Sequence, residues 1–181
     1  MGDSRPLLFV LGPSGSGKTT LGRWLAEDLD LLHLEMDLWG RDAMGVHSLR
    51  KEWDAFWGRA DAASLVSAAC ERADGAGCRG AVLTFPSAFV PRRQHRRAAE
   101  TSGIELLVLY GTGAECLAAF MRRESGSEGA LDEDYWVRHN ARPYAEFSRP
   151  AFAPYLLDVF EHGSFRDRGD LVSAVATRLG L

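Results

Sequence analysis

The chain contains few of the residues that build disulfide-bonded or metal-binding scaffolds. Among its 181 residues only three are cysteines, and Cys70, Cys78 and Cys116 match no C-x-x-C spacing. An odd number of thiols without that spacing is typical of reduced side chains rather than of a disulfide framework or a metal site. We therefore expect free thiols and a cytoplasmic protein.

Long apolar runs and a strong excess of one charge are also missing. No segment approaches the roughly 18 consecutive apolar residues of a membrane span. Charged residues stand just before the first predicted strand, so we expect no cleavable signal there. The 21 basic and 25 acidic residues give a formal net charge of −4, which disfavours a dedicated polyanion binder. We expect neither a membrane nor a nucleic acid as partner, and the oligomeric state stays open.

The pattern of apolar segments predicts an α/β protein. Hydrophobic residues make up 46% of the chain, and no repeat or long linker divides it, so we expect one domain over residues 1–181. Five short apolar segments alternate with helical patterns, which predicts a parallel sheet with helices on both faces. The predicted strands are 7–11, 31–37, 80–85, 104–110 and 155–160. The predicted helices follow the first strand, occur twice within 38–78, and then cover 91–101, 114–123, 132–147 and 167–179.

Lysine is the scarcest charged residue, and one of only two lysines completes a phosphate-binding pattern. The pattern G-x-x-x-x-G-K-[ST] lies between the first predicted strand and a helix, and is formed by Gly12, Pro13, Ser14, Gly15, Ser16, Gly17, Lys18 and Thr19. Its glycines let backbone N–H groups turn toward a β-phosphate, and the helix dipole points its positive end there. Lys18 is expected to reach the β- and γ-phosphates, and the Thr19 hydroxyl to ligate Mg²⁺. With Thr20 these residues form the predicted nucleotide site, and the absence of an N-K-x-D motif favours ATP over GTP.

This loop, together with the order of strands and helices, resembles the small P-loop kinases of the shikimate, gluconate and nucleoside-monophosphate kinase superfamily over nearly the whole chain. The resemblance implies a three-layer α/β/α P-loop NTPase fold with a five-stranded parallel sheet in the order 2-3-1-4-5. It also implies an acceptor-binding region at about 38–78 and a mobile helical lid at about 122–142.

A carboxylate follows the second predicted strand. By the resemblance, Asp37 corresponds to the group that binds the acceptor hydroxyl and is placed to take its proton. Positioning and charge neutralisation dominate phosphoryl transfer, so this group orients the nucleophile more than it forces deprotonation. Glu35 lies on the same strand face and can share or take over the role. Alternatively, Asp37 caps the next helix or ligates Mg²⁺ through water.

Four arginines fall in the lid region that the resemblance implies: Arg122, Arg123, Arg138 and Arg142. Lid closure would bring cations to the charge that develops on the transferred phosphoryl group and would exclude water. We expect at least one of the four to act in this way. The alternative for each is a solvated helix charge that pairs with a nearby carboxylate.

Three further residues are candidates for the acceptor side. Arg50 is placed like the arginine that grips the substrate carboxylate in the shikimate branch, although a solvent-facing charge is the alternative. Arg92 follows the third strand, where it would hold the phosphate of a nucleoside monophosphate. Trp53 belongs either to an aromatic wall for a ring-bearing acceptor or to the core.

The end of the third strand departs from the shikimate pattern. The residues Thr84-Phe85-Pro86-Ser87 contain no glycine-rich turn and no acidic residue, so shikimate itself is disfavoured as acceptor. Thr84 or Ser87 is a candidate partner of a magnesium-bound water, which leaves Glu35 or Asp37 as the nearby carboxylate. The loop at 161–164 is the expected adenine neighbour.

Together these features predict an ATP- and Mg²⁺-dependent kinase that phosphorylates a hydroxyl group of a small metabolite, nucleoside or antibiotic-like molecule. One alternative keeps the fold and makes a nucleoside monophosphate the acceptor. The other is a nucleotide-gated binding or regulatory module, in which ATP orders a partner surface and turnover is incidental.

Overall fold

The computed structural model describes residues 5–36, 49–124 and 133–181. Its main sheet consists of β1 (Leu7–Leu11), β2 (Leu31–Glu35), β3 (Gly80–Thr84), β4 (Glu105–Tyr110) and β5 (Leu156–Asp158). The helices are α1 (Lys18–Leu29), α2 (Arg50–Arg59), α3 (Ala62–Ala76), α4 (Arg93–Thr101), α5 (Gly113–Glu124), α6 (Glu133–Phe147) and α7 (Arg168–Leu179). A 3₁₀ helix, η2 (Pro150–Tyr155), precedes β5, and a hairpin of β6 (Phe160–Glu161) and β7 (Ser164–Phe165) follows it.

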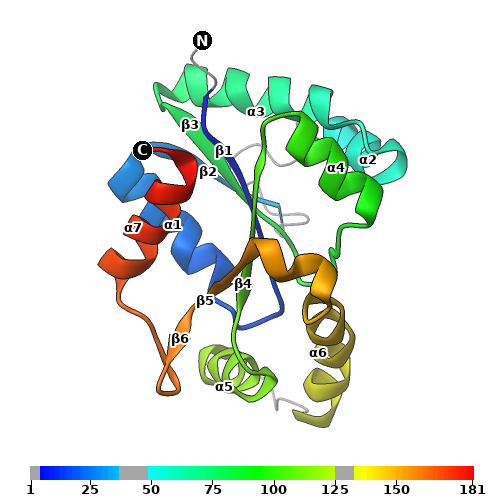
Figure 1. Ribbon diagram of the computed structural model, residues 1–181, viewed down its shortest axis with the longest axis vertical. Helices are drawn as coiled ribbons and strands as arrows, with labels where there is room; N and C mark the ends of the chain where they lie inside the picture. The colour runs from blue at the N-terminus through cyan, green and yellow to red at the C-terminus, as the bar shows by residue number, and fades with distance from the viewer. Residues whose placement is uncertain (1–4, 37–48, 125–132) are drawn as a thin grey trace.

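The five strands are parallel and lie in the order β2-β3-β1-β4-β5, which confirms the predicted strand order (Figure 1). The central strand β1 pairs with β3 on one side and with β4 on the other. All five of its residues are buried. A strand with helices on both faces needs apolar side chains in both directions, which explains the unbroken run from Leu7 to Leu11.

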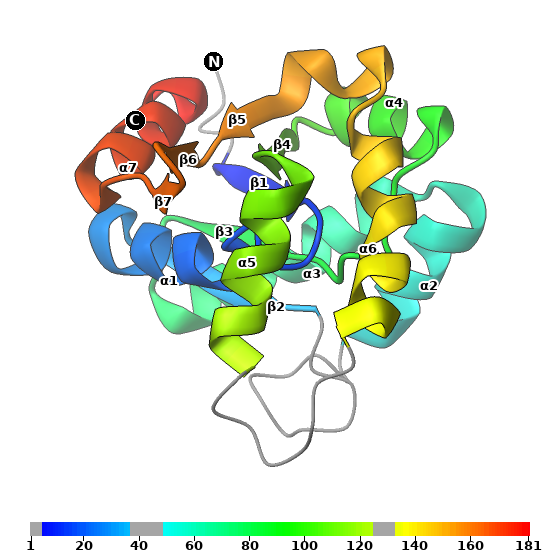
Figure 2. The same cartoon turned by 90° about the horizontal axis from the view of Figure 1, so that it is seen from below.

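Successive residues of β1 enter two separate cores. Leu7, Phe9 and Leu11 belong to the larger core, which is closed by α2, α3 and α4. Leu8 and Val10 belong to the smaller one, which is closed by α1 and α7. Figure 2 shows the resulting three layers, with α1 and α7 on one side of the sheet and α2, α3 and α4 on the other. The expected α/β/α arrangement is therefore present.

The last predicted strand is shorter than expected. The sequence predicts a strand over 155–160, whereas β5 ends at Asp158. The Asp158 carboxylate accepts the backbone N–H of Phe160, and the chain then turns out of the sheet into the β6–β7 hairpin. Residues 150–154, predicted as a loop, form most of the 3₁₀ helix η2.

All five strands run in the same direction, so their carboxyl ends share one edge of the sheet. The segment 12–17 follows β1 at this edge, and α5 and α6 lie beside it (Figures 1 and 2). Ligands of open parallel sheets bind outside the carboxyl ends of the strands. Among the described residues, no helix is long and apolar enough to cross a membrane.

Candidate functional site

The segment between β1 and α1 has the backbone of a phosphate-binding loop. Gly15 and Gly17 both adopt left-handed conformations, with φ of 80° and 81°. A Cβ atom at Gly15 would lie 1.9 Å from the carbonyl oxygen of Cys116 in α5, and one at Gly17 would lie 2.3 Å from the ring of Phe165. Positive φ and close packing together require glycine at both positions. The helix α1 begins directly after Gly17, so its positive end faces the loop.

Polar side chains within the loop stabilise this turn. The Lys18 ammonium group donates hydrogen bonds to the carbonyl oxygens of Gly12 and Pro13, both at 2.9 Å. The buried Ser16 hydroxyl also donates to the Pro13 carbonyl, at 2.9 Å. A lysine held by two loop carbonyls places its charge over the loop, where it can meet a bound phosphate. The predicted residues 12–20 are thus contiguous at the carboxyl edge.

A hydroxyl group and a carboxylate meet beside the loop. The Thr19 hydroxyl donates a 2.5 Å hydrogen bond to Oε1 of Glu35, the last residue of β2. Hard oxygen ligands of this kind suit Mg²⁺. The pair therefore fits the metal that the loop pattern implies. Groups of three or more His, Cys, Asp or Glu side chains able to hold a metal do not occur in the described parts of the chain.

Thr84 and Ser87, at and after the end of β3, form hydrogen bonds to other side chains. Thr84 is 2% exposed, and its hydroxyl lies 3.0 Å from Nε2 of His33 on β2. Burial lowers the pKa of His33 below its ordinary value, so the neutral imidazole is favoured there. Ser87 instead accepts a 2.9 Å hydrogen bond from the hydroxyl of Ser14. This contact joins the phosphate-binding loop to the segment between β3 and α4.

The structure separates the four predicted lid arginines. Arg122 and Arg123 are exposed in the last turn of α5, and Arg123 forms an ion pair at 2.7 Å with its neighbour Glu124 and lies over the Phe120 ring. Arg138 and Arg142 are exposed on α6, where Arg142 lines a cavity. The Arg123 contacts are those of a surface side chain, whereas Arg142 faces a space that a ligand can enter.

That cavity lies between α4 and α6, and we call it the arginine pocket. Its volume is about 750 Å³, and it is lined in part by Arg92, Arg93, Arg142 and the exposed indole of Trp57. The predicted acceptor residue Arg92 therefore borders a cavity. Trp53 packs within the aromatic core against Phe85 and Phe89, as its alternative interpretation stated.

The remaining acceptor candidates are not placed by the structure. Asp37 and residues 38–48 of the predicted acceptor region lie outside the described residues, as do residues 125–132 of the predicted lid. Arg50 begins α2, but its side chain is outside the described part. Loop 161–164 forms the turn of the β6–β7 hairpin, and the adjoining Phe165 packs against Gly17 of the phosphate-binding loop.

Sequence reasoning missed one residue beside the arginine pocket. His95 is 1% exposed; its Nδ1 accepts the backbone N–H of Arg92, and its Nε2 lies 3.0 Å from the carbonyl oxygen of Trp57. Since Nδ1 accepts, Nε2 carries the proton and donates to that carbonyl. The neutral ring thus connects the end of α2 to the start of α4 beneath the arginine pocket. A lone histidine in an arginine-rich segment gave no sequence signal for this role.

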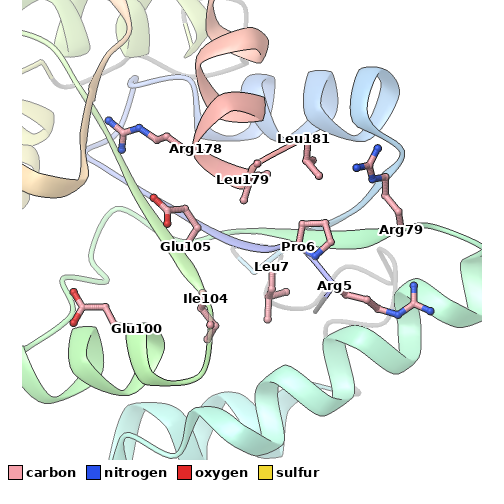
Figure 3. A pocket seen from close by; sticks show the side chains of 12 residues that line it. Arg5, Pro6, Leu7, Arg79, Glu100, Ile104, Glu105, Arg178, Leu179 and Leu181 are labelled. Carbon is pink, nitrogen blue, oxygen red and sulfur yellow. The ribbon is translucent and has the colours of Figure 1, made fainter. Parts of the chain in front are cut away.

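A second large hollow lies at the opposite edge of the sheet, and we call it the amino-edge hollow. It measures about 830 Å³, and Figure 3 shows Arg5, Arg79, Arg178, Glu100 and Glu105 around a floor of apolar side chains. Most of these charges have structural partners. Its position at the amino ends of β1 and β4, away from the phosphate-binding loop, also argues against a catalytic role.

The cysteines are free, as expected. Burial raises the pKa of the Cys116 thiol to about 11, so this thiol stays protonated near neutral pH. Its backbone carbonyl packs against Gly15 of the phosphate-binding loop. Cys116 therefore acts as a packing residue of α5.

No protein-family model matches the chain. Among curated proteins, shikimate kinase 2 of Escherichia coli is 38% identical over 60 residues, which cover 31% of this chain and 34% of that relative. The match thus spans about a third of the length of the relative.

Solved structures extend the likeness over almost the whole chain. A sugar kinase from Janibacter sp. is 21% identical and has a TM-score of 0.58, covering 97% of this chain and 94% of its own. A shikimate kinase from Acinetobacter baumannii, solved in complex with shikimate, is 16% identical with a TM-score of 0.55 and covers 98% and 95%. A gluconokinase from Sinorhizobium meliloti is 17% identical with a TM-score of 0.54 and covers 98% and 93%. The chain has the fold of these small P-loop kinases.

Proposed function

We propose that this chain, which has the fold of the small P-loop kinases, is an ATP- and Mg²⁺-dependent kinase that phosphorylates a hydroxyl group of a small molecule. Residues 1–181 would act as one domain. The observation that carries the proposal is the convergence of Lys18, the Thr19 hydroxyl and the Glu35 carboxylate at the carboxyl edge of the sheet. A lid and an acceptor carboxylate, Asp37, after the second strand are more than nucleotide binding alone needs, which favours a kinase over a regulatory module.

Each group has a distinct part in the proposed reaction. Loop N–H groups and Lys18 bind the phosphates of ATP and balance their charge. Mg²⁺, when bound, neutralises charge on the transferred phosphoryl group, and Thr19 and Glu35 would hold it. Asp37, two residues beyond Glu35, would bind the acceptor hydroxyl and orient its oxygen toward the γ-phosphate. Arginines of α5 or α6 would neutralise charge in the transition state and help to exclude water.

Calorimetry with ATP and Mg²⁺ tests the nucleotide site, and ATP consumption with a panel of hydroxyl compounds tests transfer. Asp37→Asn is expected to lower kcat by at least about 100-fold, because it removes the carboxylate that orients the acceptor hydroxyl and can take its proton, while ATP affinity changes less than about threefold. Asp30→Asn, a change of the same kind at the exposed end of α1, is the matched control. Full transfer activity in the Asp37 variant would remove this residue from the mechanism.

The second candidate function is that of a nucleoside-monophosphate kinase. It is favoured by the position of Arg92, which lines the arginine pocket. Such an enzyme would also run backwards from two nucleoside diphosphates. Formation of a triphosphate from diphosphates would favour this candidate. Transfer to a hydroxyl without that reverse reaction would favour the first.

A further inference from the structure

A further cavity lies between α5 and α6, and we call it the α5–α6 cleft. Its volume is about 220 Å³, and its walls come from Pro13 and Ser14 of the phosphate-binding loop, the first half of α5 and one face of α6. At its border Val137 is 44% exposed, so the cleft leaves apolar surface uncovered. Apolar cavities of about 150 Å³ bind molecules of the size of benzene, so this cleft has room for one ring.

Three residues of α6, spaced four apart, form one wall of the cleft region. Trp136, Asn140 and Tyr144 share a helix face because of this spacing. The Trp136 ring packs against Phe120 of α5, with ring centres 4.6 Å apart. The Tyr144 ring stacks on Tyr110 at the end of β4, with ring centres 5.5 Å apart and an interplanar angle of 15°. The wall is therefore anchored one turn before and one turn after Asn140.

The side chain of Asn140, which lines the cleft, has an unused hydrogen-bond acceptor. Its Nδ2 donates to the backbone carbonyl oxygen of Trp136 at 3.1 Å, a place that Oδ1 cannot take because it has no proton to donate. Oδ1 is buried and accepts no hydrogen bond from any described residue. In the described parts of the chain, Oε2 of Glu52 is the one other buried side-chain atom in this state. A buried acceptor without a donor costs free energy, and a ligand that donates to it recovers that cost.

The other polar side chains of the cleft are hydrogen-bonded or uncharged. The Ser14 hydroxyl donates to Ser87, and the Tyr144 hydroxyl accepts from that of Tyr110. Burial raises the pKa of the Cys116 thiol to about 11, so it is uncharged near neutral pH. No charged side chain is among the described residues of the lining. Such a lining favours an apolar molecule over ions and over ordered water, which makes about three hydrogen bonds to its surroundings.

We propose that the α5–α6 cleft binds a neutral, apolar group of about one ring that carries a single O–H or N–H donor, and that Oδ1 of Asn140 accepts this hydrogen bond. The proposal goes beyond the proposed kinase function, because binding in the cleft does not depend on phosphoryl transfer. Two sources supply such a group: the neutral end of a phosphoryl acceptor, or a separate small molecule. Phosphates and carboxylates do not suit this cleft, which separates it from the arginine pocket and from the phosphate-binding loop.

An NMR titration of the full chain with phenol and with toluene tests the proposal. The two probes share one ring and are similar in size, but toluene has a methyl group where phenol has a hydroxyl. A cleft without a free acceptor would prefer toluene, because the phenol hydroxyl would be buried without a partner. We expect phenol to bind about tenfold more tightly than toluene. Equal binding, or tighter binding of toluene, would overturn the proposal.

Asn140→Leu tests the acceptor, because it replaces the amide with an apolar side chain of similar size. It should weaken phenol binding about tenfold and change toluene binding less than about threefold. An unchanged phenol affinity in this variant would show that Asn140 does not accept the hydrogen bond, and the proposal would fail. Urea unfolding checks that the variant retains the fold.

A second pair of variants tests the location without changing Asn140. Ala114→Leu adds bulk at an exposed position of α5 that lines the cleft, and it should abolish binding of both probes. Ala118→Leu is the matched control, because it makes the same exchange at an exposed position of α5 outside the lining. It should leave both affinities unchanged. Equal probe binding in the two variants would place the probes elsewhere and contradict the proposal.

Transfer kinetics distinguish the two sources of the bound group. With an acceptor that the panel of hydroxyl compounds identifies, phenol should raise KM and leave kcat unchanged if the neutral end of that acceptor occupies the cleft. An unchanged KM at a phenol concentration that fills the cleft would assign the cleft to a separate small molecule. Absence of ATP binding would instead contradict the kinase function, and the two probes would still decide whether the cleft binds its ligand.

Discussion

The amino-edge hollow and the arginine pocket are similar in size and both are rich in arginine, yet their charges are used differently. In the hollow, Arg178 donates to the carbonyl oxygens of Leu156 and Tyr155, and Arg5 donates to the Cys78 carbonyl and pairs with Asp74. In the pocket, Arg92, Arg93 and Arg142 have no such ion pair among the described residues. The volume of a cavity therefore indicates its function less well than two other properties. These are whether its charged side chains already have partners, and at which edge of the sheet it lies.

The largest expected effect comes from two glycines, one at each edge, with similar backbone conformations. Gly15 has φ of 80° and Gly103, which lines the hollow, has φ of 73°. Gly15→Ala must displace the Cys116 carbonyl or the loop and should weaken ATP binding at least about 100-fold. Gly103→Ala meets nothing within 4 Å, so it should cost only about 1 kcal/mol of stability and leave ATP binding unchanged. Calorimetry and urea unfolding measure the two effects; similar ATP affinities in both variants would contradict the packing role of Gly15.

A smaller effect separates structural from ligand-binding arginines. Arg178→Gln should lower the free energy of unfolding by about 1 kcal/mol, because it loses charge-assisted bonds to carbonyls at the start of β5. Arg142→Gln should leave that free energy within about 0.5 kcal/mol, because its side chain is exposed. Urea unfolding of both variants at neutral pH is the measurement. Greater destabilisation by the Arg142 change would show that this residue supports the fold, and the contrast between the cavities would fail.

The smallest expected effect is on the pH dependence of the free energy of unfolding, to which His95 and Glu105 contribute with opposite sign. Burial lowers the pKa of His95 below its ordinary 6.5, so the unfolded chain takes up this proton first as the pH falls. The free energy of unfolding should therefore decrease below about pH 6.5, down to the lowered pKa. Burial raises the pKa of Glu105 above 4.5, although Arg178 opposes this, so the unfolded chain releases that proton first. Here the free energy of unfolding should decrease as the pH rises from 4.5 toward the raised pKa.

Urea unfolding across about pH 4 to 8 would follow both groups. His95→Gln retains a hydrogen-bond acceptor and a donor, and it should remove part of the decrease in the free energy of unfolding at low pH. The part due to His33, whose pKa is also lowered by burial, should remain. Glu105→Gln should remove the opposite slope. A His95 variant with an unchanged pH profile would mean that its imidazole is not held neutral between α2 and α4.

Local patterns allowed much of the fold to be predicted. The phosphate-binding loop is contiguous, so its pattern already contains the residues that meet in space, and the apolar alternation in β1 follows from burial on two faces. The strand order came from the resemblance to known kinases, since pairing between distant strands leaves little trace in one sequence. The end of β5 was misjudged because the Asp158 carboxylate, rather than a turn signal, stops the strand.

The site was less accessible to sequence reasoning. The bond between His95 and Trp57 joins residues 38 positions apart, and that between Ser14 and Ser87 joins residues 73 apart. Arg142 and Arg149 look alike in the sequence, although the Glu146 side chain three residues before Arg149 is a signal that this arginine is paired. Which arginines of the pocket have an ion-pair partner depends on the folded structure, so the sequence alone could not show it.

The contact between Gly15 and the Cys116 carbonyl has a consequence for how the chain responds to its nucleotide. With no side chain between them, the loop and helix α5 pack backbone against backbone at Gly15 and the Cys116 carbonyl. A displacement of the loop on nucleotide binding would therefore be transmitted to α5. By reciprocity, if nucleotide binding changes the affinity of α5 for a second molecule by some factor, that molecule changes the nucleotide affinity by the same factor.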